Sequence, residues 1–180
     1  MVTIKKDNQL SLEVHVNQIK EDVKKGELVL EHEIFLKLKK EVGFKEEYEG
    51  YEKLLDIIKD NEENNICRLS KKKISELYGM SYTSTLNKMN FLVRYDLIRQ
   101  VDGGFVRTEE KLNNAIPFFI MPKILALKIL RPDLRTRERK NYKKQAEILS
   151  VSLREIQVAD GFINYVIGHP ECSLYQYGLI

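Results

Sequence analysis

Residues 68–108, RLSKKKISELYGMSYTSTLNKMNFLVRYDLIRQVDGGFVRT, contain the start and stop signals of several elements in close succession. We expect a short strand over residues 66–69, then a capped helix, a tight turn, a second helix and a glycine-tipped hairpin. Ser70 is a suitable N-cap for the first helix, because its hydroxyl can accept a hydrogen bond from a free amide of the first turn. Gly79 ends that helix, since glycine readily adopts the left-handed conformation that a sharp turn requires.

Apolar residues at helical spacing predict the inner faces of both helices. On the first helix these residues are Ile74, Leu77 and Tyr78. Met80, in the turn, is expected as an apolar plug between the helices. Ser81 or Thr83 can cap the second helix. Its apolar stripe consists of Leu86, Met89, Leu92 and Val93, followed by the anchoring pair Leu97 and Ile98.

The remaining face of the second helix carries mostly hydrogen-bonding side chains. Its members are Tyr82, Thr83, Ser84, Asn87, Lys88, Asn90, Phe91 and Arg94. Such side chains near a helix N-terminus can read base edges in the major groove of DNA, and the free amides there favour phosphate. Asn87 could pair with adenine, and Lys88 or Arg94 could reach guanine or phosphate. This helix is therefore the predicted reader of DNA.

A two-stranded ribbon is expected over residues 99–107, with Asp102-Gly103-Gly104 at its turn. Val101 and Phe105 are expected to pack on the helices. Basic side chains of the ribbon and of the first helix would then contact phosphates, which positions the protein on DNA without reading sequence. These predicted contacts are Lys71, Lys72, Arg99 and Arg107.

RLSKKKISELYGMS, followed by a helix and by DLIRQVDGGFVRT, resembles the winged helix-turn-helix domain of prokaryotic transcription regulators. The resemblance covers about 55 residues, between Tyr51 and Thr108. It departs from the family's pattern at Asp96, where glycine is frequent, and at Thr85, where an apolar residue is usual. The resemblance implies a winged helix whose second helix reads DNA and whose hairpin touches the backbone.

The charge distribution also favours a nucleic-acid partner. Residues 66–144 contain 18 Lys and Arg against 7 Asp and Glu, a net charge of +11, whereas the whole chain has +3. Residues 1–65 have a net charge of −5 and residues 145–180 have −3. A concentrated positive block is suited to displacing counterions from a polyanion.

The segments before this region are expected to form an extension. VTIKKDNQLSLEVHV alternates around an Asp-Asn pair, which predicts a β-hairpin over residues 2–16. Residues 17–42 are expected to be helical, although Leu28-Val29-Leu30 also fits a strand. A further helix is expected over residues 48–61. The expected domains are an N-terminal extension (1–47), the winged helix-turn-helix (48–115) and a C-terminal helical region (116–180).

In the C-terminal region, residues 108–116 predict a short helix, and Pro122 suits the first turn of a helix over residues 123–130. A long helix is expected over residues 135–167. A heptad-like stripe along it consists of Tyr142, Ala146, Leu149, Leu153 and Ile156. This stripe favours a homodimer, and the alternative is packing within one chain.

Residues 131–144 contain seven basic residues against two acidic ones. They can grip phosphates beside the main site, or they can form a solvated helix start. The candidate contacts are Arg135, Arg137, Arg139, Lys140, Lys143 and Lys144.

Other classes of protein receive little support. No stretch is long and apolar enough to span a bilayer, and no signal peptide is recognisable, so we expect a cytoplasmic protein without membrane contact. The two cysteines predict no disulfide framework, and His169 with Cys172 lacks further metal ligands nearby. No motif indicates catalysis or a cofactor, and no small-molecule effector can be named.

The sequence therefore predicts a mainly α protein with a small β component (α+β), built on a winged helix-turn-helix with an N-terminal hairpin and helix and a long C-terminal helix. We expect sequence-specific binding of double-stranded DNA by a prokaryotic or mobile-element transcription regulator acting as a homodimer. One alternative is a plasmid or phage replication-initiation or partition protein. Another is a winged-helix module that binds protein.

Overall fold

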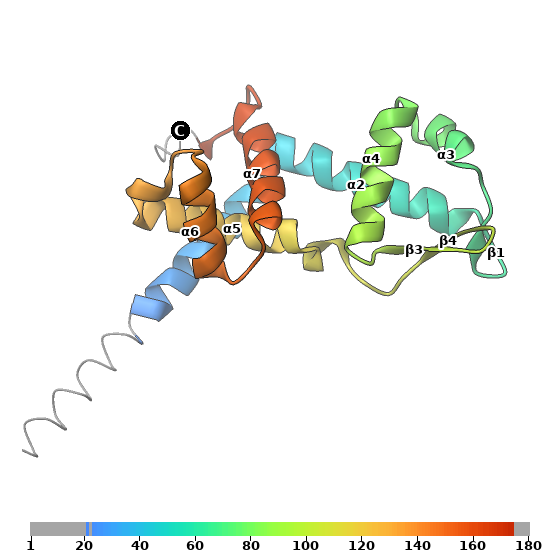
Figure 1. The fold of residues 1–180 in the computed structure, drawn as a ribbon. Coiled ribbons are helices and arrows are strands. Elements are labelled where there is room, and N and C mark those ends of the chain that lie inside the picture. Colours follow the sequence, from blue (N-terminus) through green and yellow to red (C-terminus); the bar gives the residue numbers. More distant parts are fainter. Residues whose placement is uncertain (1–20, 22, 175–180) are drawn as a thin grey trace, which may run out of the picture.

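The computed structural model describes residue 21 and residues 23–174, and it is mainly helical with one small antiparallel sheet (Figure 1). A helix over residues 23–38 comes first. The later helices are α2 (Val42–Asp60), α3 (Lys71–Tyr78), α4 (Tyr82–Arg94), η1 (Leu112–Asn114), α5 (Ile116–Leu130), η2 (Pro132–Leu134), α6 (Arg139–Leu149) and α7 (Leu153–Gly168). The strands are β1 (Glu62–Glu63), β2 (Ile66–Cys67), β3 (Ile98–Val101) and β4 (Gly104–Arg107). The predicted hairpin over residues 2–16 lies outside the described residues.

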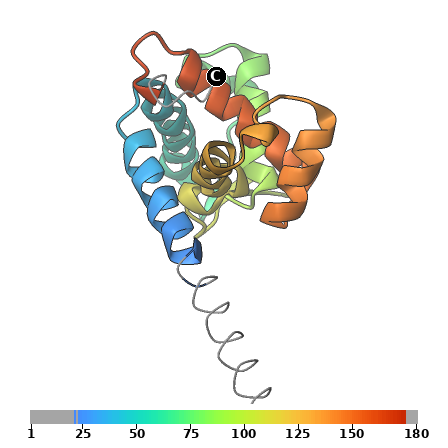
Figure 2. The ribbon, with the colours of Figure 1, turned by 90° about the vertical axis from the view of Figure 1, so that its left-hand side faces the viewer.

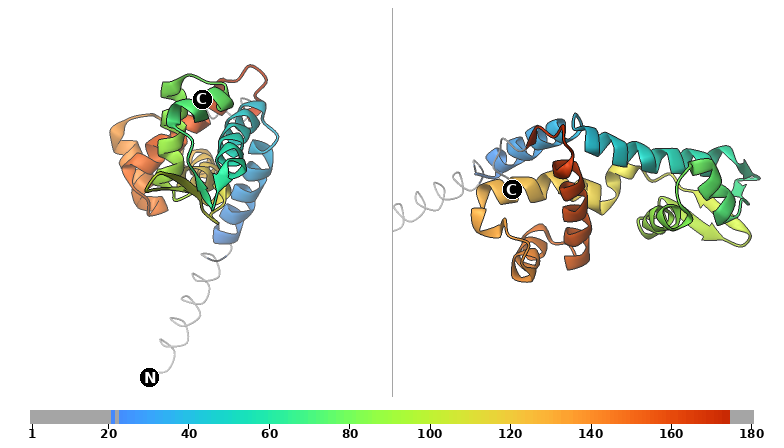
Figure 3. Two further views of the ribbon diagram at one scale, coloured as in Figure 1. Left: turned by 90° about the vertical axis from the view of Figure 1, so that its right-hand side faces the viewer. Right: turned by 90° about the horizontal axis from the view of Figure 1, so that it is seen from above.

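Helix α2 is the long central element of the molecule. In Figures 1 and 3 it runs from the lobe containing α5, α6 and α7 to the part containing α3, α4 and the sheet. Its buried residues Tyr51, Leu54, Leu55 and Ile58 recur at the spacing of one helix face. The predicted helix over residues 48–61 is confirmed, but it begins earlier, at Val42. Leu28-Val29-Leu30 is helical.

The signals that predicted α3 and the start of α4 are confirmed. The Ser70 hydroxyl accepts a hydrogen bond from the Lys73 amide (3.1 Å), and Gly79 has a left-handed φ of 79°. The Ser81 hydroxyl caps α4 by accepting from the Ser84 amide (3.2 Å). These local interactions lie at the helix boundaries, and Lys53 of α2 adds a hydrogen bond to the carbonyl of Tyr78 at the end of α3 (3.0 Å).

Two apolar positions of α3 and the turn after it were predicted incorrectly. Leu77 and Met80 are 45% and 46% exposed, so they are not part of the core. Ser75 takes the buried position on α3 instead, beside Ile74. Its hydroxyl donates to the Met80 carbonyl (3.0 Å), so a hydrogen bond rather than an apolar plug holds the turn.

Helix α4 is buried over a wider arc than its apolar stripe predicted. Thr85, Met89 and Leu92 are buried, and the Thr85 hydroxyl donates to the Ser81 carbonyl (3.1 Å), which satisfies its polar group. Phe91, predicted on the polar face, is also buried, whereas Val93, predicted in the core, is 39% exposed. The arc extends to Phe91 because the C-terminal lobe packs against this side of α4, where the Phe91 ring lies 5.7 Å from Phe162.

The sheet has the strand order β1-β2-β4-β3, and the expected pairing of residues 66–69 beside the hairpin is confirmed. Gly103 turns the chain with a φ of 80°. A methyl group built on Gly104 would lie 2.2 Å from the Cys67 carbonyl oxygen, so only glycine fits this close strand pairing. Phe105 is buried as predicted, but Val101 is 36% exposed because β3 turns its outer half to solvent.

Helix α5 passes through Pro122 and does not begin there, which corrects the expectation. It starts at Ile116, and Pro117 occupies its first turn, where a missing amide is tolerated. Figure 2 shows α5 nearly end-on, with residues 23–38 on one side and α6 and α7 on the other. This enclosure stabilises the helix despite the hydrogen bond that Pro122 cannot make. The short helix expected over residues 108–116 is the single turn η1.

The long helix expected over residues 135–167 is wrong, because the chain forms two helices. Ser150 adopts a left-handed φ of 53°, and Ser152 starts α7 with a capping box that includes Glu155. The predicted heptad stripe is therefore divided between α6 and α7. Its members Ala146 and Ile156 are buried within the chain, which favours the intramolecular alternative and removes the basis for a zipper dimer.

Candidate nucleic-acid interface

Helix α4 presents a polar, acid-free stripe to solvent. The stripe consists of Thr83, Asn87, Asn90 and Arg94, all exposed and spaced to share one face. Tyr82, at the first position of α4, is 50% exposed, and Ser84 is half-buried with its hydroxyl 2.9 Å from that of Ser81. The stripe places two carboxamides, one hydroxyl and one guanidinium on the surface, which are groups that bind base edges and phosphates.

Lys88 does not lie on this stripe. Its amino group donates to the Glu47 carboxylate of α2 and lies 4.0 Å from the centre of the Tyr51 ring. Only 15% of its side chain is exposed. Lys88 thus joins α4 to α2, and its partner, 41 residues earlier, could not be found from the local pattern.

Basic residues also lie at the start of α3 and in the segment that leads from β2 into it. Lys71 is half-buried and Lys72 is exposed. Arg68, which was not predicted as a contact, is exposed and extends toward the hairpin tip. A methyl group built on Gly103 would lie 2.7 Å from its guanidinium nitrogen Nη1. Arg68 thus adds a cation at the tip of the β3–β4 hairpin.

The two predicted hairpin arginines face different surroundings. Arg99 donates two hydrogen bonds to the Asp96 carboxylate, of 2.8 and 2.9 Å, and its side chain remains 65% exposed. These bonds hold the pKa of Asp96 below its ordinary value. Arg107 instead turns toward α2, where it pairs with Asp56 (3.0 Å) and Glu52 (3.9 Å). Both arginines are therefore paired, and Arg99 is the more exposed of the two (65% against 29%).

Helix α6 carries a second basic face. The first two turns of this helix expose four cations, which are Arg139, Lys140, Lys143 and Lys144. The first turn contains no acidic residue. Lys140 pairs with Glu138 (2.7 Å) at the surface. Cations near a helix N-terminus oppose the helix dipole, so they do not stabilise α6. Figure 3 shows α4 and α6 on the same side of α2.

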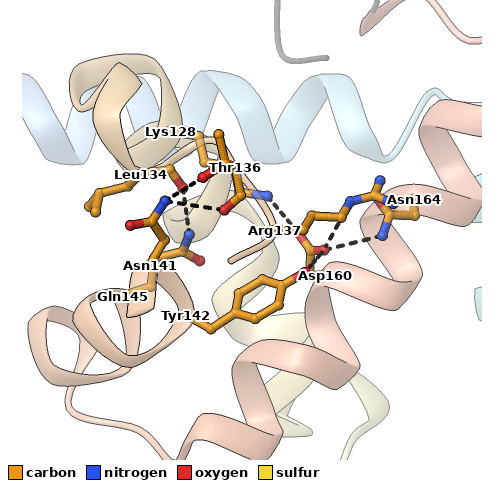
Figure 4. Close-up of polar contacts among 9 residues, drawn as sticks. All are labelled: Lys128, Leu134, Thr136, Arg137, Asn141, Tyr142, Gln145, Asp160 and Asn164. Atoms are coloured by element: carbon orange, nitrogen blue, oxygen red, sulfur yellow. Dashed lines mark hydrogen bonds and ion pairs between the residues drawn. The ribbon is translucent and has the colours of Figure 1, made fainter. Parts of the chain in front are cut away.

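Two other predicted phosphate contacts act as anchors of the loop before α6, and Figure 4 shows one of them, Arg137, beside Asp160 and Asn164. Arg135 is half-buried and donates from Nε to the Lys128 carbonyl (2.8 Å). Arg137 donates to the Asn164 side chain, and its Nε lies 3.7 Å from the Asp160 carboxylate. These contacts fix the loop on α5 and α7 and thereby set the position of the basic face of α6.

Asp160 is the centre of this anchor. Its carboxylate is 2% exposed, forms a buried ion pair with Lys128 and accepts hydrogen bonds from Tyr142 (2.8 Å) and Asn164 (3.2 Å). Burial raises the pKa of Asp160, but the bond and charge of Lys128 and the hydrogen bonds of Tyr142 and Asn164 together outweigh it, and the pKa lies below its ordinary value. Burial and the bond to Asp160 raise the pKa of Tyr142 to about 12.

Comparisons with protein-family models, with curated proteins and with solved structures each gave no significant match. Within residues 23–174, no group of three or more His, Cys, Asp and Glu side chains is placed to hold a metal ion. None of the helices in the described part of the chain has the length and apolarity to cross a membrane.

Proposed function

We propose that the chain is a sequence-specific double-stranded DNA-binding protein that regulates transcription. The proposal takes α3, the turn at Gly79, α4 and the β3–β4 hairpin as a winged helix-turn-helix in which α4 enters the major groove. The observation that carries it is the exposed, acid-free stripe Thr83, Asn87, Asn90 and Arg94, on a helix whose other face is buried. The proposal includes no catalytic step and no cofactor.

The contacts can be divided by their chemistry. Asn87 and Asn90 are assigned to base edges, because a carboxamide can both donate to and accept from adenine. Arg94, Arg99 and Lys72 are assigned to phosphates near α4, and Arg68 joins them at the hairpin tip. The basic face of α6 would contact backbone farther along the same duplex. Lys88 is assigned to the packing of α4 and has no part in reading bases.

Homodimerisation is not required by this proposal, because the stripe that suggested it is packed within the chain. A replication-initiation or partition protein would use the same contacts and would differ only in where its site lies. Mapping the bound site to a promoter or to an origin distinguishes these roles.

A second candidate function, protein binding through the same helix pair, is favoured by one observation. Leu77, Met80 and Tyr82 are each about half exposed beside the turn between α3 and α4 (45%, 46% and 50%). Exposed apolar side chains grouped on one surface are typical of protein interfaces. Under this alternative, replacing Leu77 and Met80 by Ser abolishes binding of the partner protein. The unmodified protein then has no affinity for duplex DNA.

The test of the proposal is binding to duplex DNA over a range of salt concentrations. Log affinity should fall linearly with log salt, with a slope of about −0.9 for each phosphate contacted. A matched control replaces Lys24 and Lys25, exposed lysines of the helix over residues 23–38, by Ala and should leave the slope unchanged. Absence of binding at low salt would contradict the proposal.

A further inference from the structure

An apolar cavity lies between the helix over residues 23–38, α2, η1 and α5. Its volume is about 370 Å³, which is within the range of small-molecule sites. Phe44 and Phe118, both buried, form part of its lining, and Leu28 and Phe119 are 54% and 57% exposed. The cavity thus combines an aromatic wall that belongs to the core with apolar side chains that a ligand would cover.

The polar groups of the lining indicate which ligand fits. Glu31 and Lys123 pair with each other at 2.9 Å and join two walls of the cavity, so neither charge requires a counterion from a ligand. Lys123 also lies 5.3 Å from the centre of the Phe119 ring. Asn113 and Asn114 supply amides, and His32 an imidazole, that can donate to or accept from a bound group. A flat, uncharged aromatic molecule with one or two hydrogen-bonding groups matches this lining.

The cavity is connected to α4 by stacked rings. Phe118 lies in the lining, and its ring packs 5.0 Å from Phe162 and 5.8 Å from Phe91 of α4. Phe91 directly follows Asn90 in the proposed reading face. A ligand that displaces Phe118 must therefore shift the packing of α4, because close-packed side chains transmit small displacements.

We propose that this cavity binds a small, uncharged aromatic molecule and that its occupancy changes the affinity of α4 for DNA. The coupling to DNA rests on the proposed function, whereas the ligand site and its effect on Phe91 do not. A typical coupling between two such sites is about 5–150-fold in affinity, and it acts equally in both directions.

Indole is a suitable probe for the site, because the chain contains no tryptophan and indole fluorescence can be excited selectively. Indole should bind saturably to the full chain. Leu28→Glu and Phe119→Glu place a charge in the apolar lining and should each weaken binding by about tenfold or more. Leu36→Glu and Leu130→Glu are matched controls, since both residues are about half exposed on the same two helices but do not line the cavity (47% and 49%). They should leave indole affinity unchanged.

The connection to α4 can be measured without DNA. In protein labelled with fluorinated phenylalanine, indole should shift the ¹⁹F resonance of Phe91 and leave that of Phe105, in β4 and outside the ring cluster, in place. Indole should then change DNA affinity by the same factor by which DNA changes indole affinity. Unsaturable binding, or binding that survives Leu28→Glu and Phe119→Glu, overturns the site. If indole leaves the ¹⁹F resonance of Phe91 unchanged, the coupling is overturned. If indole binds and shifts this resonance but the protein does not bind DNA, only the proposed function is contradicted.

Discussion

Lys88 of α4 forms its ion pair with Glu47 of α2, over the face of the Tyr51 ring. A side chain that was predicted to contact guanine or phosphate is thereby used to attach α4 to the central helix. The proposed reading face then depends on Asn87, Asn90 and their exposed neighbours, and this division of roles can be tested residue by residue.

Replacing Lys88 by Ala should destabilise the protein rather than impair DNA recognition. The change leaves the largely buried Glu47 carboxylate without its partner, which costs about 1–3 kcal/mol in the free energy of unfolding. Urea unfolding measures this loss. Lys73→Ala is the control, because Lys73 and Glu76 form a pair that is more than half exposed and worth about 0.5 kcal/mol. A large loss of DNA affinity with unchanged stability would contradict the assignment of Lys88.

The two hairpin arginines should give opposite results. Arg99→Ala should weaken binding to every duplex and reduce the salt slope by about 1, because it removes one phosphate contact. Arg107→Ala should leave the slope unchanged and lower stability, since Asp56 and Glu52 of α2 lose their common partner. Salt titrations and urea unfolding of both variants distinguish the roles. Equal slopes for Arg99→Ala and the unmodified protein would exclude Arg99 from the interface.

The basic face of α6 should contribute affinity without sequence preference. Lys143→Ala and Lys144→Ala should each reduce the salt slope by about 1 on any duplex long enough to reach α6. Shortening the duplex on the α6 side removes every contact of this face, so it should reduce the slope of unmodified protein by at least as much as both substitutions together. On the shortened duplex, the variants and unmodified protein should have the same slope. If duplex length has no effect, α6 does not contact DNA.

Asp160 should make stability dependent on pH in the acidic range. Its pKa is lower in the folded protein than the ordinary value, so its contribution is complete above the unfolded pKa of about 4 and is lost as the pH falls through the folded pKa. Asp160→Asn leaves Lys128 buried without a counterion and should cost about 3–5 kcal/mol at neutral pH. The difference from unmodified protein should shrink on acidification. Tyr142→Phe, which removes one hydrogen bond, should cost about 1 kcal/mol. A difference that is constant from neutral to acidic pH would contradict this role.

The sequence predicted best those elements whose boundaries depend on neighbouring residues. Ser70, Gly79 and Ser81 act within one helical turn, and Gly103 acts within the hairpin, so their roles follow from local chemistry. The break between α6 and α7 also had a local signal, because Ser152 and Glu155 have the spacing of a capping box. The heptad-like stripe obscured this signal.

The positions that could not be predicted depend on residues far away in the chain. Phe91 is buried because Phe118 and Phe162 pack against it, and periodicity within α4 contains no information on those rings. The same applies to Lys88 and its partner Glu47. Arg135 and Arg137 are held by Lys128 and Asn164, so composition correctly located a basic segment but could not separate its anchors from its exposed cations.

Base reading by α4 can be tested by selecting bound duplexes from a random DNA pool, with unmodified protein and with Asn87→Ala in parallel. Unmodified protein should enrich a defined sequence, and Asn87→Ala should lose the preference at one position. Affinity for the selected site should fall by about 1–3 kcal/mol, while affinity for random duplex should not change. No enriched sequence, or an identical sequence preference for both proteins, would contradict the assignment of α4 as the reader of DNA.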